Sequence, residues 1–212
     1  MSLRHVLVAL LLVGGLTACA SDGPDASAGA SSASPSGTST AEPLPTGKSD
    51  LAVAAGTYLS PEGFSPALEL QVPAGWTSVH RAADAFDLGK PDPERDAPLV
   101  AVVVMRPPQA TAAEAVKAVR DAATGAVAPV VGDFLVGKPA LGLDVLDGDG
   151  EVVSSADGGV ALDAAAGQRL RVLAVDVGGS PLLVAVVVPD ATRWDDAWPE
   201  AKGLLTGISA AA

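Results

Sequence analysis

Cysteine and histidine, which carry most nucleophilic and metal-binding chemistry, are almost absent from this sequence. Its 212 residues include one cysteine, Cys19, and two histidines, of which only His80 lies beyond residue 18. A single cysteine cannot form an intrachain disulfide, a lone histidine has no readable catalytic partner, and no Gly-x-Ser-x-Gly motif occurs. We therefore predict no catalytic residue, no metal site and no cofactor.

Basic residues are also scarce. The formal net charge is −12, and residues 51–212 alone hold 11 basic and 21 acidic side chains, a net charge of −10. An acidic surface repels phosphate backbones, so the composition argues against nucleic acid as a partner. It also argues against docking onto an anionic membrane by charge alone.

The apolar segment near the N-terminus is too short to span a bilayer. Residues 6–16 form an apolar run of eleven residues behind Arg4, whereas a spanning helix needs about 20. This pattern is typical of a secretory signal peptide. It ends in Leu16-Thr17-Ala18-Cys19, which resembles the bacterial lipobox, where cleavage precedes a cysteine that receives a diacylglycerol. We predict that residues 1–18 are removed and that lipid on Cys19 anchors the chain to the extracytoplasmic face of the cell membrane.

Large apolar side chains are missing from the segment that follows. Of the 31 residues in 20–50, 25 are Ser, Ala, Gly, Pro or Thr, and Leu44 is the only large apolar one. Such a segment buries too little surface to offset the entropy lost on ordering. We predict that residues 19–50 form a disordered linker and that residues 51–212 fold as one domain, long enough to bury about 70% of its unfolded surface.

The domain is rich in short apolar segments with the spacing of strands. Strands are predicted at residues 67–72, 76–80, 85–88, 99–105, 130–136, 140–146, 151–155, 168–177 and 182–188. Gly178-Gly179 predicts a hairpin between the last two, and Asp147-Gly148-Asp149-Gly150 predicts one between 140–146 and 151–155. The continuous apolar run at 99–105 is typical of a strand covered on both faces.

Two helices are predicted among these strands. Thr111 and Glu114 form a capping box before a helix at 112–123, and Asp190 is expected to cap a terminal helix that Pro199 kinks or divides. The apolar stripe of that terminal helix comprises Trp194, Ala197, Trp198, Ala201, Leu205 and Ile208. Because hairpins predominate, we expect an α+β fold in which helices flank an antiparallel sheet.

The acidic run at residues 147–151 allows two interpretations. Asp147, Asp149 and Glu151 match the first ligand positions of an EF-hand calcium loop. However, Val152 stands where the loop requires glycine, and Gly158 stands where it requires glutamate. A tight turn, with glycines at positive φ and aspartates bonding local amides, explains the run better.

The tryptophans and His80 also have a functional and a structural interpretation. Trp76, Trp194 and Trp198 would stack on a ligand in the first and anchor the core in the second, and with seven aromatic residues in the chain we favour the core. His80 lies in a predicted strand without a partner, so we interpret it as structural.

One family resemblance follows from residues 64–76 (FSPALELQVPAGW), an apolar strand that runs into Pro73-Ala74-Gly75-Trp76. This pattern resembles actinobacterial envelope lipoproteins of the LpqN/LpqT type, in which a lipobox and a linker precede a domain similar to the photosystem protein PsbP. The segment 137–140, the hairpin at Gly178-Gly179 and the terminal helix follow in the same order. The resemblance covers residues 56–208 and implies a PsbP-like α/β/α sandwich with an accessory or binding role in the cell envelope. It carries over no catalytic residues.

These observations favour a non-enzymatic envelope module that binds an envelope protein or an apolar ligand, through residues that the sequence does not identify. The alternative is a hydrolase of envelope glycans or lipids. It predicts a cleft where two carboxylates converge with raised pKa values. A third interpretation is a purely structural scaffold, from which an enclosed apolar pocket would distinguish a ligand-binding module.

Overall fold

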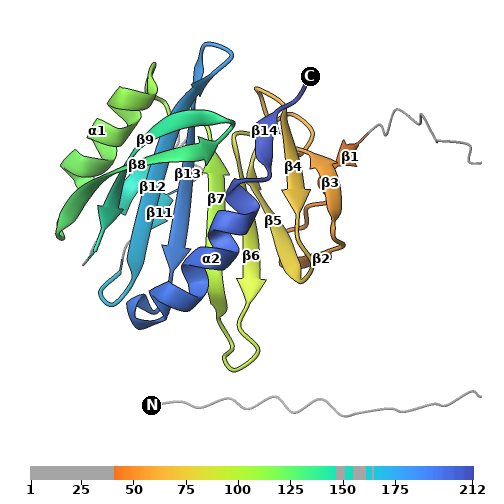
Figure 1. Cartoon of the computed structure of the whole chain (residues 1–212), viewed down its shortest axis with the longest axis horizontal. Coiled ribbons are helices and arrows are strands. Elements are labelled where there is room, and N and C mark those ends of the chain that lie inside the picture. The colour runs from red at the N-terminus through yellow and green to blue at the C-terminus, as the bar shows by residue number, and fades with distance from the viewer. Residues whose placement is uncertain (1–40, 147–150, 155–160, 164) are drawn as a thin grey trace, which may run out of the picture. The chain divides into compact units, whose positions relative to one another are not determined.

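The computed structural model describes residues 41–146, 151–154, 161–163 and 165–212 of the chain (Figure 1). Its strands are β1 (Glu42–Pro43), β2 (Leu51–Val53), β3 (Gly56–Leu59), β4 (Leu68–Val72), β5 (Trp76–Ala82), β6 (Ala85–Pro91), β7 (Pro98–Met105), β8 (Val127–Leu135), β9 (Lys138–Val145), β10 (Glu151–Ser154), β11 (Ala161–Asp163), β12 (Arg169–Val177), β13 (Ser180–Val188) and β14 (Ile208–Ala210). The helices are α1 (Ala112–Ala122), a 3-10 turn (Ala191–Arg193) and α2 (Trp194–Leu205).

An eight-stranded antiparallel sheet forms the centre of the fold, in the order β2-β5-β6-β7-β13-β12-β9-β8. A second sheet has the order β1-β3-β4-β14, in which only the short β1–β3 pair is parallel. Strands β10 and β11 pair with each other. The fold is therefore of the α+β class, mostly antiparallel sheet with two helices, as the sequence predicts (Figure 1).

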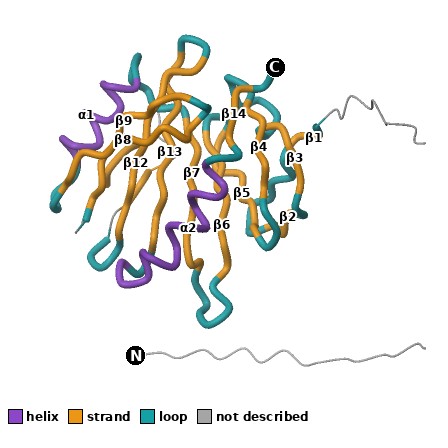
Figure 2. Tube along the Cα trace, viewed as in Figure 1, coloured by secondary structure: helices purple, strands orange, loops and turns teal. Residues whose placement is uncertain are grey.

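The two helices pack against opposite faces of the large sheet. Alternation along β7 sends Val100, Val102 and Val104 into one core and Val103 and Met105 into another. The first core also contains the apolar residues of α2 and β4, and the second contains those of α1. The two helices stand out in purple among the strands in Figure 2. The expectation that residues 99–105 are covered on both faces is confirmed for Val100 and for 102–105, whereas Leu99 and Ala101 are only partly buried.

Local signals explain the elements that the sequence predicts well. The Thr111 hydroxyl accepts from the amide of Glu114, 3.2 Å away, and the Glu114 carboxylate accepts from the amide of Ala110 at 3.1 Å. These bonds satisfy amides that the first turn of α1 leaves free. Gly178 and Gly179 adopt φ values of 58° and 80° in the turn between β12 and β13. Both values suit the two-residue hairpin that the sequence predicts.

The predicted hairpin between 140–146 and 151–155 is wrong. Strand β9 lies between β12 and β8, and β10 pairs with β11 instead. The connection before β9 is a two-residue turn, Val136-Gly137, with φ values of 55° and 63°. A β-branched residue seldom adopts positive φ, so the sequence gives little indication of this turn. The turn at residues 147–150 lies outside the described residues.

The terminal helix differs from the prediction in two respects. It runs as one α-helix through Pro199, and the irregular first turn is the 3-10 segment before Trp194. Pro199 and Asp195 are both exposed, so the Asp195 carbonyl, for which the proline supplies no N–H donor, lies on the solvent side of the helix. Ile208 is buried as expected, but it belongs to β14, opposite Leu70 of β4.

The domain also begins before the predicted boundary at residue 51. Strand β1 pairs with β3, and Leu44 is buried in the same core as the apolar residues of α2. The backbone amide of His80 donates to the carbonyl of Gly47 at 2.9 Å. Part of the predicted linker therefore packs against the domain, because Leu44 finds an apolar site that composition alone does not reveal.

Candidate functional site

A pocket of about 510 Å³ opens over one end of the large sheet, on the face that α1 covers elsewhere. Its lining comes from β5, β6, β7, the turn between β6 and β7, and the residue before β2. The lining residues are Asp50, Thr77, Val79, Arg81, Asp87, Gly89, Pro91, Asp92, Arg95, Asp96, Ala97, Pro98 and Ala101. Helix α1 packs mainly on β12, β10 and β9, and to a smaller extent on β13, and leaves this end of the face open.

Strand alternation positions the pocket residues. On β6, Phe86 and Leu88 face the core shared with α2, so Asp87 between them faces the pocket. On β5, the buried Trp76 alternates with Thr77, which lines the pocket. The Thr77 hydroxyl donates to the carbonyl of Gly89, 3.3 Å away. The pocket floor is thus part of the rigid sheet.

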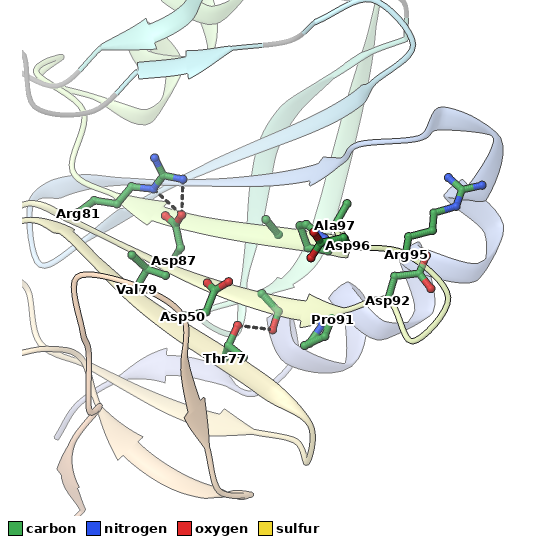
Figure 3. A pocket seen from close by; sticks show the side chains of 13 residues that line it. Asp50, Thr77, Val79, Arg81, Asp87, Pro91, Asp92, Arg95, Asp96 and Ala97 are labelled. Atoms are coloured by element: carbon green, nitrogen blue, oxygen red, sulfur yellow. Dashed lines mark hydrogen bonds and ion pairs between the residues drawn. The ribbon is translucent and has the colours of Figure 1, made fainter. Parts of the chain in front are cut away.

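Asp87 and Arg81 form an ion pair at one end of the pocket (Figure 3). Both Nε and Nη2 of Arg81 contact the same carboxylate oxygen, Oδ2 of Asp87. The Asp87 side chain is 9% exposed, whereas the Arg81 side chain is 43% exposed. The second oxygen, Asp87 Oδ1, is buried and has no hydrogen-bond partner. A buried acceptor without a donor is costly, and such atoms are uncommon in folded proteins.

The environment of Asp87 disfavours its charged form. Burial, the largest effect, raises the pKa of the Asp87 carboxyl; the Arg81 guanidinium opposes this rise, and the Asp50 carboxylate adds to it. Raised carboxyl pKa values in clefts are more frequent at functional sites than elsewhere. Asp87 therefore marks this pocket as the candidate site.

Ion pairs at the other end of the pocket connect it to the start of α2. Arg95 Nη1 lies 2.6 Å from Asp190 Oδ2, and Arg193 Nη1 lies 3.0 Å from Asp92 Oδ2. Hydrogen bonds from Thr192 and Arg95 lower the pKa of Asp190 to about 2. These contacts hold the β6–β7 turn and thereby fix the rim of the pocket.

The tryptophans serve the core, as the sequence predicts, with one addition. Trp76 is 1% exposed and Trp194 is 7% exposed, and Trp198 stacks on Trp194 with ring centroids 5.4 Å apart. Arg169 lies over the Trp194 ring, with Cζ 3.9 Å from its centroid, and Arg171 lies 4.1 Å from the Trp198 centroid. Cation–π contacts of this kind stabilise the packing of α2 on β12.

His80 lies away from the pocket. It is exposed on β5 beside a shallow depression formed with residues 43–48. Asp195 and Asp196 lie in the first turn of α2, where negative charge favours the helix dipole, and Asp196 pairs with Arg193. None of these three residues lines the candidate site.

Several residues singled out by the sequence lie beyond the described structure. These are the lipobox residues Leu16, Thr17, Ala18 and Cys19 and the acidic pair Asp147 and Asp149; the side chain of Glu151 is also not described. In the ranges that the structure covers, no group of three or more His, Cys, Asp or Glu is placed to hold a metal ion. No helix in those ranges is both long and apolar enough to cross a membrane.

Sequence reasoning missed Asp87 and Arg81. Asp87 stands between Phe86 and Leu88, in a segment predicted to be a strand, and six residues after Arg81 across a tight turn. When two large apolar residues of a strand face the core on one side of the sheet, an aspartate between them points to the opposite side. That pattern identifies the residue, but only the fold shows that no helix covers it.

Comparison with known proteins adds little. The chain matches no model of a known protein family, and it matches no curated protein sequence. A crystal structure at 1.50 Å resolution of a protein from Bacteroides thetaiotaomicron VPI-5482 is similar with a TM-score of 0.40 and 10% identity over 68% of this chain. The chain spans 45% of that protein's length.

Proposed function

We propose that the chain is a lipoprotein anchored through Cys19 at the extracytoplasmic face of the cell membrane, and that its domain is a non-enzymatic binding module of the envelope. We further propose that the pocket over β5, β6 and β7 is the binding site. The observation that carries this proposal is Asp87, a buried carboxylate with one oxygen lacking a donor, in an open pocket. A ligand that supplies the donor would remove a cost that the free protein carries.

The pocket lining favours a small polar ligand with an apolar part over a purely apolar one. The lining combines charged side chains such as Asp87 and Arg81 with apolar ones such as Val79, Pro98 and Ala101. Its volume is within the range of ligand sites, about 300–1,000 Å³. An envelope component with a charged or hydroxylated head fits this lining better than a hydrocarbon chain.

The finer fold assignment belongs to the same proposal. An antiparallel sheet with one helix against each face agrees with a PsbP-like α/β/α sandwich. The additional four-stranded sheet packs in the core that contains α2. We propose that the chain is a divergent lipoprotein of the LpqN/LpqT type.

Native mass spectrometry of the full chain extracted from membranes tests the binding role. We expect the wild-type chain to retain a small-molecule adduct and Ala101→Trp, which fills the pocket, to lose it. Ala113→Trp, on the exposed side of α1, is the matched control and should retain the adduct. Ala97→Trp, at the exposed rim, is a second filler if Ala101→Trp is unstable. An adduct that persists in both filled variants would contradict the proposal.

Membrane fractionation tests the anchor separately. Cys19→Ala should move the protein from the membrane pellet to the soluble extracytoplasmic fraction, because two acyl chains provide the stable attachment. Cys19→Ser removes the thiol with less change in size and should behave in the same way. Retention of both variants in the pellet would contradict lipid anchoring.

A hydrolase that uses carboxylates is the second candidate function. Two acidic residues, Asp50 and Asp87, line one pocket, and Asp50 contributes to the raised pKa of Asp87. A protonated Asp87 would serve as general acid. Release of sugar or fatty acid from envelope extract by the wild-type chain, with loss of that activity in Asp87→Asn and retention in Asp195→Asn, would favour this function over binding alone.

A further inference from the structure

The charged side chains of the pocket favour a cationic ligand over an anionic one. The lining holds four carboxylates and two guanidinium groups, from Asp50, Asp87, Asp92, Asp96, Arg81 and Arg95. Both guanidinium groups already bind carboxylates, Arg81 on Asp87 and Arg95 on Asp190. An anionic ligand that engaged either guanidinium would therefore leave the displaced carboxylate unpaired beside the ligand's own negative charge.

Negative charge, in contrast, is available to a ligand. No ion pair involves Asp50 or Asp96 in the part of the chain that the structure describes. Asp50 also acts on Asp87 by charge repulsion. The pocket thus has an excess of negative charge, in a domain whose net charge is itself negative.

The unpartnered atom in the pocket is an acceptor. Asp87 Oδ1 lacks a donor because Arg81 places both of its contacting nitrogens on Oδ2. An ionised carboxylate only accepts hydrogen bonds, so the missing group is an N–H or O–H donor. An ammonium N–H donor adds the attraction of a positive charge for this carboxylate, which a neutral hydroxyl donor does not supply.

Resting on the proposed function, we infer that the ligand of this pocket is a small organic cation whose primary ammonium group donates to the Asp87 carboxylate. Asp50 adds long-range attraction, and the carbon skeleton of the ligand lies on Val79 and Ala101. In this arrangement the Arg81 side chain, which is 43% exposed, moves to another rotamer and opens Asp87 Oδ1, which is buried in the free protein, to the ammonium group. The pocket selects against carboxylates and phosphates, which would meet Asp50 and Asp96.

A matched series of five-carbon probes tests the inference on the full acylated chain in non-ionic detergent micelles. The probes are 1,5-diaminopentane, 1,5-pentanediol and pentanedioate, which have similar length but are cationic, neutral and anionic. Binding is followed at pH 7.5 through the amide chemical shifts of Thr77, Gly89 and Ala101. We expect 1,5-diaminopentane to bind at least about tenfold more tightly than the diol, because only the diamine adds charge attraction, and pentanedioate to show no saturable shift.

Three substitutions distinguish the site from a general charge effect. Asp87→Asn should weaken diamine binding by about 10- to 100-fold, the range for a lost hydrogen bond to a charged group. Asp50→Asn should weaken it by about two- to fivefold, an effect that disappears at high salt. Asp195→Asn removes an exposed charge of α2 outside the pocket and should leave the affinity unchanged.

The substitution Arg81→Gln should not weaken diamine binding, in contrast to Asp87→Asn. Removal of the internal cation should leave diamine binding at least as tight as in the wild-type chain, whereas a site that used Arg81 to hold an anion would lose affinity. If Asp87→Asn does not fold, the contrast between Arg81→Gln and Asp50→Asn still distinguishes a cation site from an anion site.

Three results would overturn the inference. Equal affinity for the diol and the diamine would indicate a polyol site, and tighter binding of pentanedioate would indicate an anion site. In either case the binding role would stand. Absence of binding by all three probes would also overturn the inference, while the adduct comparison between Ala101→Trp and Ala113→Trp would decide independently whether the pocket binds a ligand at all.

Discussion

Substitution of Gly142 tests the position of β9 in the sheet. Gly142 lies opposite Leu173 of β12 and Val130 of β8. A Cβ atom at this position would stand 2.3 Å from the carbonyl oxygen of Val172 and 2.7 Å from Leu173 Cδ2. Backbone must therefore shift to accept even one methyl group, and it can shift little between two paired strands. The hairpin that the sequence predicts would instead place residues 151–155 beside this strand, in the position of β8 or β12.

The expected magnitude follows from the clash. Forced insertion of a methyl group into packed structure costs about 1–3 kcal/mol. In a domain of this size each kcal/mol changes the unfolding midpoint by about 2–4 °C, so Gly142→Ala should lower the midpoint by roughly 2–12 °C. Gly203 provides the matched control, because nothing lies within 4 Å of a Cβ there and the residue is exposed inside α2. Gly203→Ala should raise stability by about 1 kcal/mol.

Urea unfolding followed by tryptophan fluorescence measures both variants on the same scale. Gly142→Ala should lower the urea midpoint and Gly203→Ala should raise it, with similar denaturant slopes, because the surface exposed on unfolding is unchanged. A Gly142→Ala protein as stable as the wild type would mean that β12 does not lie against β9, and the topology described above would be wrong.

Two further predictions concern the hairpin and the pH dependence of stability. Gly178→Asn should leave the thermal midpoint nearly unchanged, whereas Gly178→Val should lower stability by about 1–3 kcal/mol, because φ is 58° there. Because the pKa of the Asp87 carboxyl is raised in the folded state, the stability that this group contributes is fully present below pH 3.8 and is lost as the pH rises through the folded pKa. The thermal midpoint of Asp87→Asn relative to that of the wild type should therefore increase between pH 4 and pH 7. Because the pKa of the Asp190 carboxyl is lowered to about 2 in the folded state, the stability that this group contributes is present above pH 3.8 and is lost towards pH 2. Asp190→Asn should therefore be less stable than the wild type at pH 7 and equal to it near pH 2. Calorimetry of the two variants should thus give pH trends of opposite sign, and parallel trends would contradict the environments described for these carboxylates.

Elements with local determinants could be predicted from the sequence. The capping box at Thr111 and Glu114 identified α1, and Gly178-Gly179 identified the β12–β13 hairpin, because the residues that decide these structures are adjacent in the chain. The apolar run of β7 indicated burial on both faces for the same reason. The α+β class followed from these elements together.

Pairings that depend on distant segments could not be predicted in this way. Nothing near β9 indicates that β12, 25 residues or more away, becomes its neighbour. The turn at Val136 uses a residue type that turn statistics disfavour. Leu44 is an isolated apolar residue among prolines, and its burial depends on a site created by the rest of the domain.

In the candidate site, too, some features follow from the local sequence and others depend on distant segments of the chain. The strand that carries Asp87 was predicted, and alternation already placed Asp87 and Phe86 on opposite faces. Whether the face with Asp87 is solvated, covered or hollowed depends on where α1 packs, which is a tertiary property. Its partner Arg81 is recognisable only when the β5–β6 register is known.

Hydrogen–deuterium exchange on the full chain tests the central claim, that the pocket over β5, β6 and β7 binds a ligand, most directly. Protein extracted gently from membranes, with its adduct retained, is compared with protein stripped of the adduct by dialysis in detergent. The account predicts slower amide exchange in the loaded protein at β5, β6 and the β6–β7 turn, with unchanged exchange in α1 and β8. Protection confined to α1, α2 or β8, with none around Asp87, would contradict it.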